Sequence, residues 1–175
     1  GRRSPEFYKG DVWLVTINYE FFPSPCMAQG KLDAVEETLS RVSIKDAINI
    51  AYLFSPDFLL IKDYIFVADF FSRWGKKTYS YEEHLKKVNR LEKQFDGDSK
   101  KIEQMINSWS IVDFFCSQNA ETPISDKDIE TLCEALVYCW KLRVTELFPS
   151  KSIIIESGYE IMGELGLTIT LYQNR

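Results

Sequence analysis

The residue best suited to acid–base or metal chemistry is a single histidine. His84 is the one imidazole in the chain, and it follows Glu82 and Glu83 at the predicted start of a helix. A general base needs a positioned partner, and a helical metal site needs a second ligand one turn away. The positions one turn away hold Val88 and Ser80, which are not ligands of that kind. We therefore expect His84 to be an exposed residue of a helix start.

Four cysteines are present, and their spacing argues against a metal site or a redox motif. They are Cys26, Cys116, Cys133 and Cys139, and no pair has the C-x-x-C spacing of zinc or thioredoxin-type sites. Cys133 and Cys139 share one predicted helix, but at this separation they face different sides of it and do not pair. We expect free, mostly buried thiols in a reducing compartment.

The segment Asp96–Ser99 resembles the start of a calcium-binding loop but lacks its later ligands. Lys100 and Asn107 stand where such a loop needs an oxygen ligand and a closing carboxylate. Phosphate-binding loops, dinucleotide-binding glycine motifs and nucleophile elbows are also missing from the sequence. We therefore assign no catalytic residue, metal or cofactor. Carboxylates that the fold brings together are the alternative that spacing leaves open.

Two aromatic segments and one acidic cluster are the candidates for binding a partner. Phe21–Pro25 contains Phe22 beside two prolines, and Phe70–Gly75 contains Trp74. Aromatic residues anchor many protein interfaces. The acidic residues, which would attract a basic partner, are Glu121, Asp126, Asp128, Glu130 and Glu134. The alternatives are that helices bury the aromatic residues and that the carboxylates stabilise a helix start.

Alternation of apolar and polar residues predicts strands at both ends of the chain. Asp11–Phe22 has a period of two and is rich in β-branched and aromatic residues. Ser152–Glu156 and Leu165–Tyr172 are predicted near the C-terminus, on either side of the glycine-containing connection Ser157–Gly163. In Leu165–Tyr172 the odd-numbered residues are large and aliphatic, which predicts a strand with one buried face.

Between these strands, apolar residues recur at helical spacing. The predicted helices are Lys31–Val42, Ile44–Phe54, Tyr81–Phe95, Lys100–Ser117 and Asp126–Phe148. Ser80 and Glu83 have the spacing of a capping box at the start of the third. The stretch Asp57–Trp74 fits either a hairpin with a polar turn or a helix. Its β-branched and aromatic content favours the hairpin.

Helices clustered between strand groups predict an α+β fold, with an antiparallel sheet of about five strands and about five helices packed mainly on one face. Asp11–Phe22 and Leu165–Tyr172 are expected to lie in that sheet. Residues 1–7 have the character of an expression-tag remnant, and residues 8–175 are predicted to form a single domain.

Composition indicates a protein partner rather than nucleic acid or a membrane. The chain of 175 residues has a net charge of −5, and an acidic chain binds phosphate backbones poorly. Aromatic residues make up 14% of the sequence, which suits either a large core or an interface. No stretch is long and apolar enough to span a membrane and no signal peptide is recognisable, so a cytoplasmic location is expected.

These observations favour a non-catalytic protein-binding domain of a kind typical of small bacterial α+β proteins. The most specific hypothesis is an immunity or antitoxin-type inhibitor of a basic toxin, because the chain is small, acidic and rich in aromatic residues. One alternative is an enzyme or small-ligand-binding protein that uses carboxylates and tyrosines in a pocket between sheet and helices. Another is a structural protein that forms homo-oligomers through the edge of the Asp11–Phe22 strand.

Overall fold

The chain divides into two compact units, Gly1–Ile44 and Lys45–Arg175. The computed structural model describes residues 36–38, 40–73, 80–116 and 125–175. Almost every helix and strand belongs to the second unit, which also holds the groove discussed below.

The first unit contributes few described residues. Within the predicted helix Lys31–Val42, residues 36–38 are helical and residues 40–42 form turns and bends. The predicted strand Asp11–Phe22 and the proposed tag remnant lie outside the described residues, so both stay predictions.

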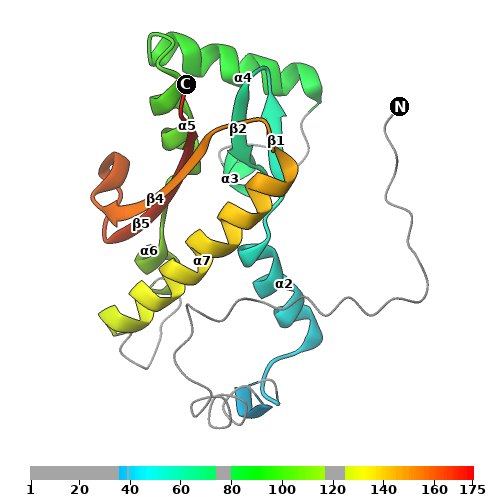
Figure 1. Cartoon of the computed structure of the whole chain (residues 1–175), viewed down its shortest axis with the longest axis vertical. Coiled ribbons are helices and arrows are strands. Elements are labelled where there is room, and N and C mark those ends of the chain that lie inside the picture. The colour runs from blue at the N-terminus through cyan, green and yellow to red at the C-terminus, as the bar shows by residue number, and fades with distance from the viewer. Residues whose placement is uncertain (1–35, 39, 74–79, 117–124) are drawn as a thin grey trace, which may run out of the picture. The chain divides into compact units, whose positions relative to one another are not determined.

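The stretch that fits two patterns is a hairpin followed by a short helix. The elements in order are α2 (Ile44–Phe54), β1 (Phe58–Ile61), β2 (Tyr64–Val67) and α3 (Ala68–Arg73), as Figure 1 shows. The β-strand prediction is therefore confirmed for the apolar runs, while the residues after them are helical. Lys62 adopts a φ of 55° in the two-residue turn, the left-handed conformation that such tight hairpins require.

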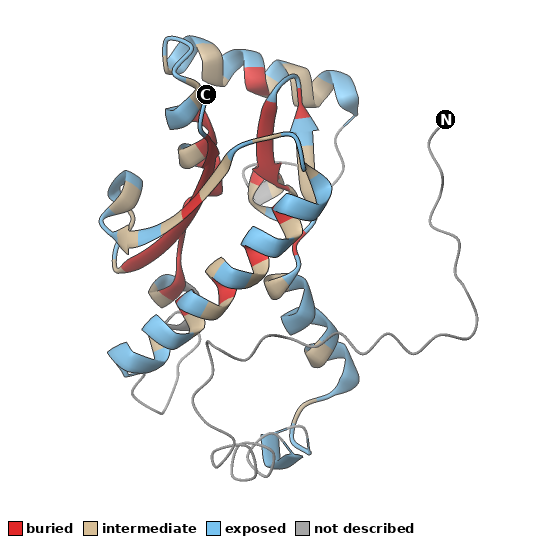
Figure 2. Cartoon of the chain, viewed as in Figure 1, coloured by how far each residue is buried: buried red, intermediate tan, exposed pale blue. Residues whose placement is uncertain are grey.

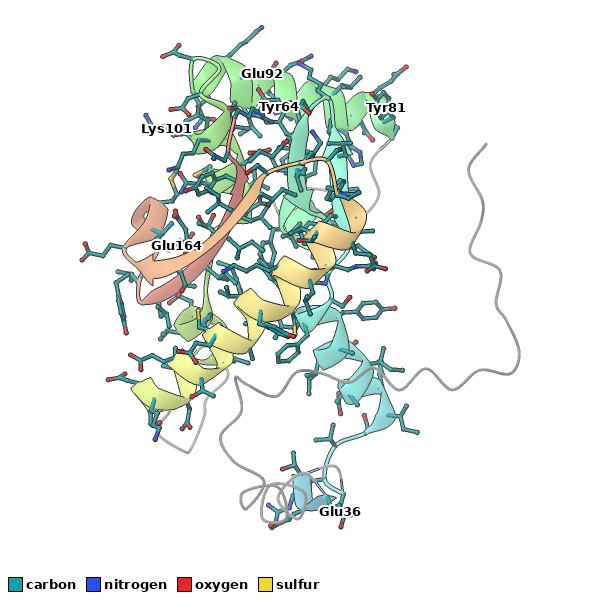
Figure 3. All side chains as sticks on the ribbon, viewed as in Figure 1. Glu36, Tyr64, Tyr81, Glu92, Lys101 and Glu164 are labelled. Carbon is teal, nitrogen blue, oxygen red and sulfur yellow. The ribbon has the colours of Figure 1, made fainter. Side chains whose placement is uncertain are left out.

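Side-chain caps start the next long helices, α4 (Tyr81–Gln94), α5 (Ser99–Asn107) and α7 (Asp126–Leu147). Ser80 and Glu83 form the predicted capping box. Asp98 accepts a hydrogen bond from the Lys101 amide (3.0 Å), so the acidic loop before α5 is a helix-connecting turn. From α4, Glu92 reaches the Tyr64 hydroxyl, which donates to it at 3.2 Å (Figure 3).

The predicted helix Lys100–Ser117 is interrupted at Trp109. It consists of α5, the two-residue strand β3 (Trp109–Ser110) and α6 (Ile111–Cys116). Ser110 Oγ accepts a hydrogen bond from the Asp113 amide (3.2 Å) and so begins a new helix. Trp109 pairs with Ile169 of a neighbouring strand, which places its indole in the core.

The five described strands are antiparallel and form two sheets, which confirms the α+β class with about five strands. One sheet is the β1–β2 hairpin, and the other has the order β3–β5–β4, with β4 at Ile153–Tyr159 and β5 at Leu167–Gln173. β4 and β5 run beside α7 (Figure 1). The predicted strand Ser152–Glu156 is thus longer than expected, because Ser157–Tyr159 continue the pairing with β5.

Every residue of β5 is buried, so the prediction of a strand with one buried face is wrong (Figure 2). The aliphatic face packs in the core that includes α7. On the other face, Ser108, the C-cap of α5, donates to Thr170 (3.3 Å), and the Lys100 ammonium lies 4.2 Å from the Tyr172 ring centroid. Leu165, expected in the strand, lies before it and is 75% exposed.

Candidate functional site

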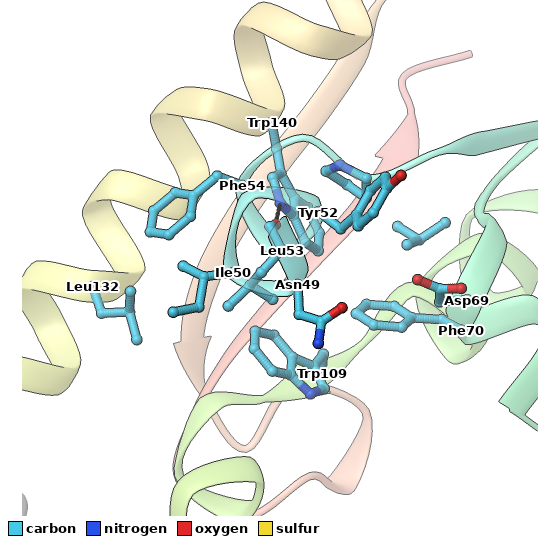
Figure 4. A pocket seen from close by; sticks show the side chains of 12 residues that line it. Asn49, Ile50, Tyr52, Leu53, Phe54, Asp69, Phe70, Trp109, Leu132 and Trp140 are labelled. Carbon is cyan, nitrogen blue, oxygen red and sulfur yellow. Dashed lines mark hydrogen bonds between the residues drawn. The ribbon is translucent and has the colours of Figure 1, made fainter. Parts of the chain in front are cut away.

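A groove with a volume of about 580 Å³ lies among α2, α3, α7 and the ends of two strands (Figure 4). Its described lining is mainly aromatic and aliphatic and consists of Asn49, Ile50, Tyr52, Leu53, Phe54, Pro56, Val67, Asp69, Phe70, Trp109, Leu132 and Trp140. Its volume is within the range of small-molecule and side-chain pockets.

Three aromatic rings form one wall of this groove. The Phe70 ring centroid lies 5.9 Å from that of Trp109 and 6.0 Å from that of Trp140. The Trp140 Nε1–H donates to the Leu53 carbonyl oxygen (2.9 Å), which ties the end of α2 to α7. Both indoles are almost fully buried, so the wall is preformed by the core.

The opposite wall is α2, an apolar helix that is not buried. None of its 11 residues, all of them described, falls in the buried class. A stripe of α2 with helical spacing, whose last residue also lines the groove, is 82% exposed at Ile44, 50% at Ile48 and 58% at Tyr52. A helix that is hydrophobic on most sides is normally buried, so α2 presents apolar surface for contact.

The polar chemistry of the groove is sparse. Among the described lining residues, Asp69 has the one charged side chain, and Asn49 and Tyr52 add an amide and a phenol. Asp69 lies in the first turn of α3, where the helix dipole favours a carboxylate. General acid–base catalysis usually employs two or more positioned groups, so this lining is better suited to binding than to catalysis.

The most polar buried cluster lies elsewhere, on α5. Glu103 and Asn107 are both fully buried and lie one helical turn apart. Glu103 accepts hydrogen bonds from the amides of Ile65 in β2 (2.9 Å) and Gln173 in β5 (2.8 Å). Asn107 accepts from the Val67 amide (2.9 Å) and donates to the carbonyl oxygens of Ile65 (2.9 Å) and Leu171 (3.1 Å).

These two side chains therefore take the place of a strand between β2 and β5, and we call them the α5 bridge. Glu103 also accepts from the Gln173 side-chain amide (2.8 Å), and Arg175 lies 3.3 Å from it as counterion. A buried carboxylate whose hydrogen bonds are taken up by backbone amides has a structural role. Sequence reasoning missed both residues, since the only signal was their i, i+4 spacing beside Ile102 and Ile106.

The structure describes four of the seven residues predicted to bind a partner. Phe22, Trp74 and Glu121 lie outside the described residues. Asp126, Asp128, Glu130 and Glu134 are all exposed along the first half of α7. Glu130 and Glu134 are each two positions from Leu132, so they project from the opposite side of α7 to the groove, and Asp128, one turn before Leu132, shares its side. The acidic cluster and the groove are thus largely separate surfaces.

The histidine and the described thiols are packed rather than poised for catalysis. The His84 ring contacts Phe71 edge to face at 5.4 Å, so His84 is half-buried instead of exposed as expected. Cys133 and Cys139 are free thiols. Burial raises the pKa of each, and Ser157 offsets this in part at Cys133, so the unreactive thiol form is favoured at neutral pH.

Nowhere in the described ranges do three or more His, Cys, Asp or Glu side chains converge as a metal site would require. None of the helices that the structure describes has the length and apolar character of a membrane span. No protein-family model matches the chain, and no curated protein or solved structure shows significant similarity to it.

Proposed function

We infer that this chain is a protein-binding domain, and we favour an immunity or antitoxin-type inhibitor that blocks a basic toxin. The observation that supports this most is α2, whose apolar side chains are exposed next to an aromatic groove. Interfaces are anchored by a few aromatic or aliphatic side chains in pockets, and the acidic side of α7 would steer a basic partner toward the chain.

The test is co-expression with the product of the adjacent gene. We expect a 1:1 complex in light scattering that weakens as salt is raised. We also expect cells that express both proteins to grow, and cells that express the partner alone to be inhibited. Ile48→Asp, on α2, abolishes the complex and the growth protection, whereas Leu165→Asp, an exposed leucine in the β4–β5 loop, changes neither. Equal effects of the two substitutions, or no complex at any salt concentration, would overturn the proposal.

A small-ligand-binding protein is the second candidate, because the groove holds Asp69 and Tyr52 among aromatic rings. The volume of about 580 Å³ suits a drug-sized molecule. A ligand that survives purification and is identified by mass spectrometry of the denatured protein would favour this function. Binding of the adjacent gene product with the groove still accessible to such a ligand would argue against it.

A further inference from the structure

We propose that the groove binds an apolar side chain of a partner protein that is flanked by a lysine or arginine. This inference rests on the proposed protein-binding function and specifies the chemistry of the partner. It follows from two features of the described lining residues, namely an aromatic wall and the carboxylate of Asp69, which is the one charged group among them.

The aromatic wall provides the contact for the apolar side chain. Phe70 lies between the two buried indoles, so the rings are held by the core before anything binds. A preformed pocket avoids the entropy cost of ordering its own side chains on binding. Phe70 is the half-buried ring of the wall, and its accessible face can attract a cation, so a charge next to the apolar side chain is favourable there.

The charges around the groove select for a positive partner. Asp69 lines it directly, and helical spacing puts one further carboxylate on the same side of α2 and of α7 as their lining residues. Asp46 precedes Asn49 by three residues and Ile50 by four on α2, and Asp128 precedes Leu132 by four on α7. Of the nearby basic residues, Arg143, toward the end of α7, pairs with Glu146 at 3.2 Å. Lys45 lies at the edge of the side of α2 that lines the groove.

Three small probes with one ring and different charges test the chemistry: phenethylamine, 2-phenylethanol and 3-phenylpropionate. Binding is followed on the full chain through the indole N–H signals of Trp109 and Trp140 in two-dimensional NMR. The amine is expected to bind about three- to tenfold more tightly than the carboxylate, with the alcohol between them. Equal binding of all three, or no perturbation because another segment or a second copy already fills the groove, overturns the inference.

Two matched variants test whether the carboxylate of Asp69 causes the preference for the amine. Asp69→Asn is expected to remove the preference for the amine. Asp113→Asn is the matched control, because Asp113 occupies the first turn of α6, a helix of the same length as α3 that also follows a strand directly. Asp113 is not among the lining residues of the groove, so this variant should retain the preference. Loss of the preference in both variants would indicate a general effect of net charge and contradict a role for Asp69.

The partner complex separates this inference from the proposed function. Asp69→Lys and Ile50→Ala both change exposed residues, so folding is retained and is checked by circular dichroism. Each is expected to weaken the complex at least tenfold, since interface anchors and buried charge contacts have effects of this size. A complex insensitive to both would overturn the inference and keep the protein-binding function. If the amine binds but no protein partner is found, the claim that a protein occupies the groove is overturned, and the groove is a site for small amines.

Discussion

Helices α5 and α2 invert the usual relation between polarity and burial. α5 buries Glu103 and Asn107 completely, while α2 leaves Ile44, Ile48 and Tyr52 largely exposed. On α5 the buried polar atoms bond to backbone groups of β2 and β5 and so join the two sheets. On α2 the C-terminal residues Leu53 and Phe54 pack against the core, and the exposed apolar side chains lie before them.

The buried polar residues of α5 and the exposed apolar residues of α2 indicate different roles. A buried polar group is costly unless it is paired, so a fully paired one marks a structural requirement. An exposed apolar helix gains nothing in the free chain, so it marks a surface that becomes useful on binding. Substitutions of the buried polar residues of α5 should therefore change stability, and substitutions of the exposed apolar residues of α2 should change binding alone.

The largest expected effect comes from the α5 bridge. Glu103→Ala leaves the Ile65 and Gln173 amides without acceptors in a buried site, which lowers the free energy of unfolding by about 3–5 kcal/mol. Chemical denaturation followed by circular dichroism measures it. Glu130→Ala, an exposed glutamate of α7, is the control and should change stability by less than about 0.5 kcal/mol. A loss of similar size in both variants would contradict the structural role of the bridge.

A smaller effect is expected where α2 is tied to the core. Trp140→Phe keeps an aromatic ring but removes the hydrogen bond from the indole nitrogen to the Leu53 carbonyl oxygen. We expect a loss of about 1–2 kcal/mol and faster amide exchange confined to α2. Exchange that accelerates equally in α5 would show that α2 does not move independently.

Asp63, in the β1–β2 turn, gives a small pH dependence near the α5 bridge. The hydrogen bond from Lys151 is the largest cause that lowers the pKa of Asp63. Because the folded pKa lies below the unfolded value, its contribution is complete above about pH 4 and is lost as pH falls through the folded pKa. Because Asp63 is exposed to solvent, its contribution to the free energy of unfolding stays under about 1 kcal/mol. Asp63→Asn should flatten the stability profile between pH 6 and 2, and an unchanged slope would contradict this.

The smallest change in stability is expected on α2 itself. Ile48→Asp places a charge on a half-exposed position and should alter the free energy of unfolding by less than about 0.5 kcal/mol. Val88→Asp, at a fully buried position of α4, should prevent folding and serves as the contrast. A large destabilisation by Ile48→Asp would mean that α2 is covered in the free protein.

Local features were predictable from the sequence because local groups determine them. The capping box at Ser80 and Glu83, the hairpin after α2 and the bounds of α2 all depend on residues a few positions apart. The break at Trp109 was missed, since its apolar pattern also fits a helix and the competing pair, Ile169, lies far along the chain.

Features that depend on distant partners could not be predicted. Glu103 bonds to residues 38 and 70 positions away, and nothing near it in the sequence indicates that β2 and β5 will flank it. The burial of Thr168 and Thr170, on the face of β5 opposite its aliphatic residues, is of the same kind, because α5 covers a strand face that its sequence marks as polar. The exposure of α2 was equally hidden, as its pattern fits a core helix.

Hydrogen exchange of α2 and α5, in the free protein and in complex with its partner, tests the account most directly. In the free protein, the amides of residues Ile44–Phe54 should exchange much faster than those of Ser99–Asn107. In the complex, α2 should become protected while α5 stays unchanged. Equal, strong protection of both helices in the free protein would contradict the account, because α2 would then already be covered.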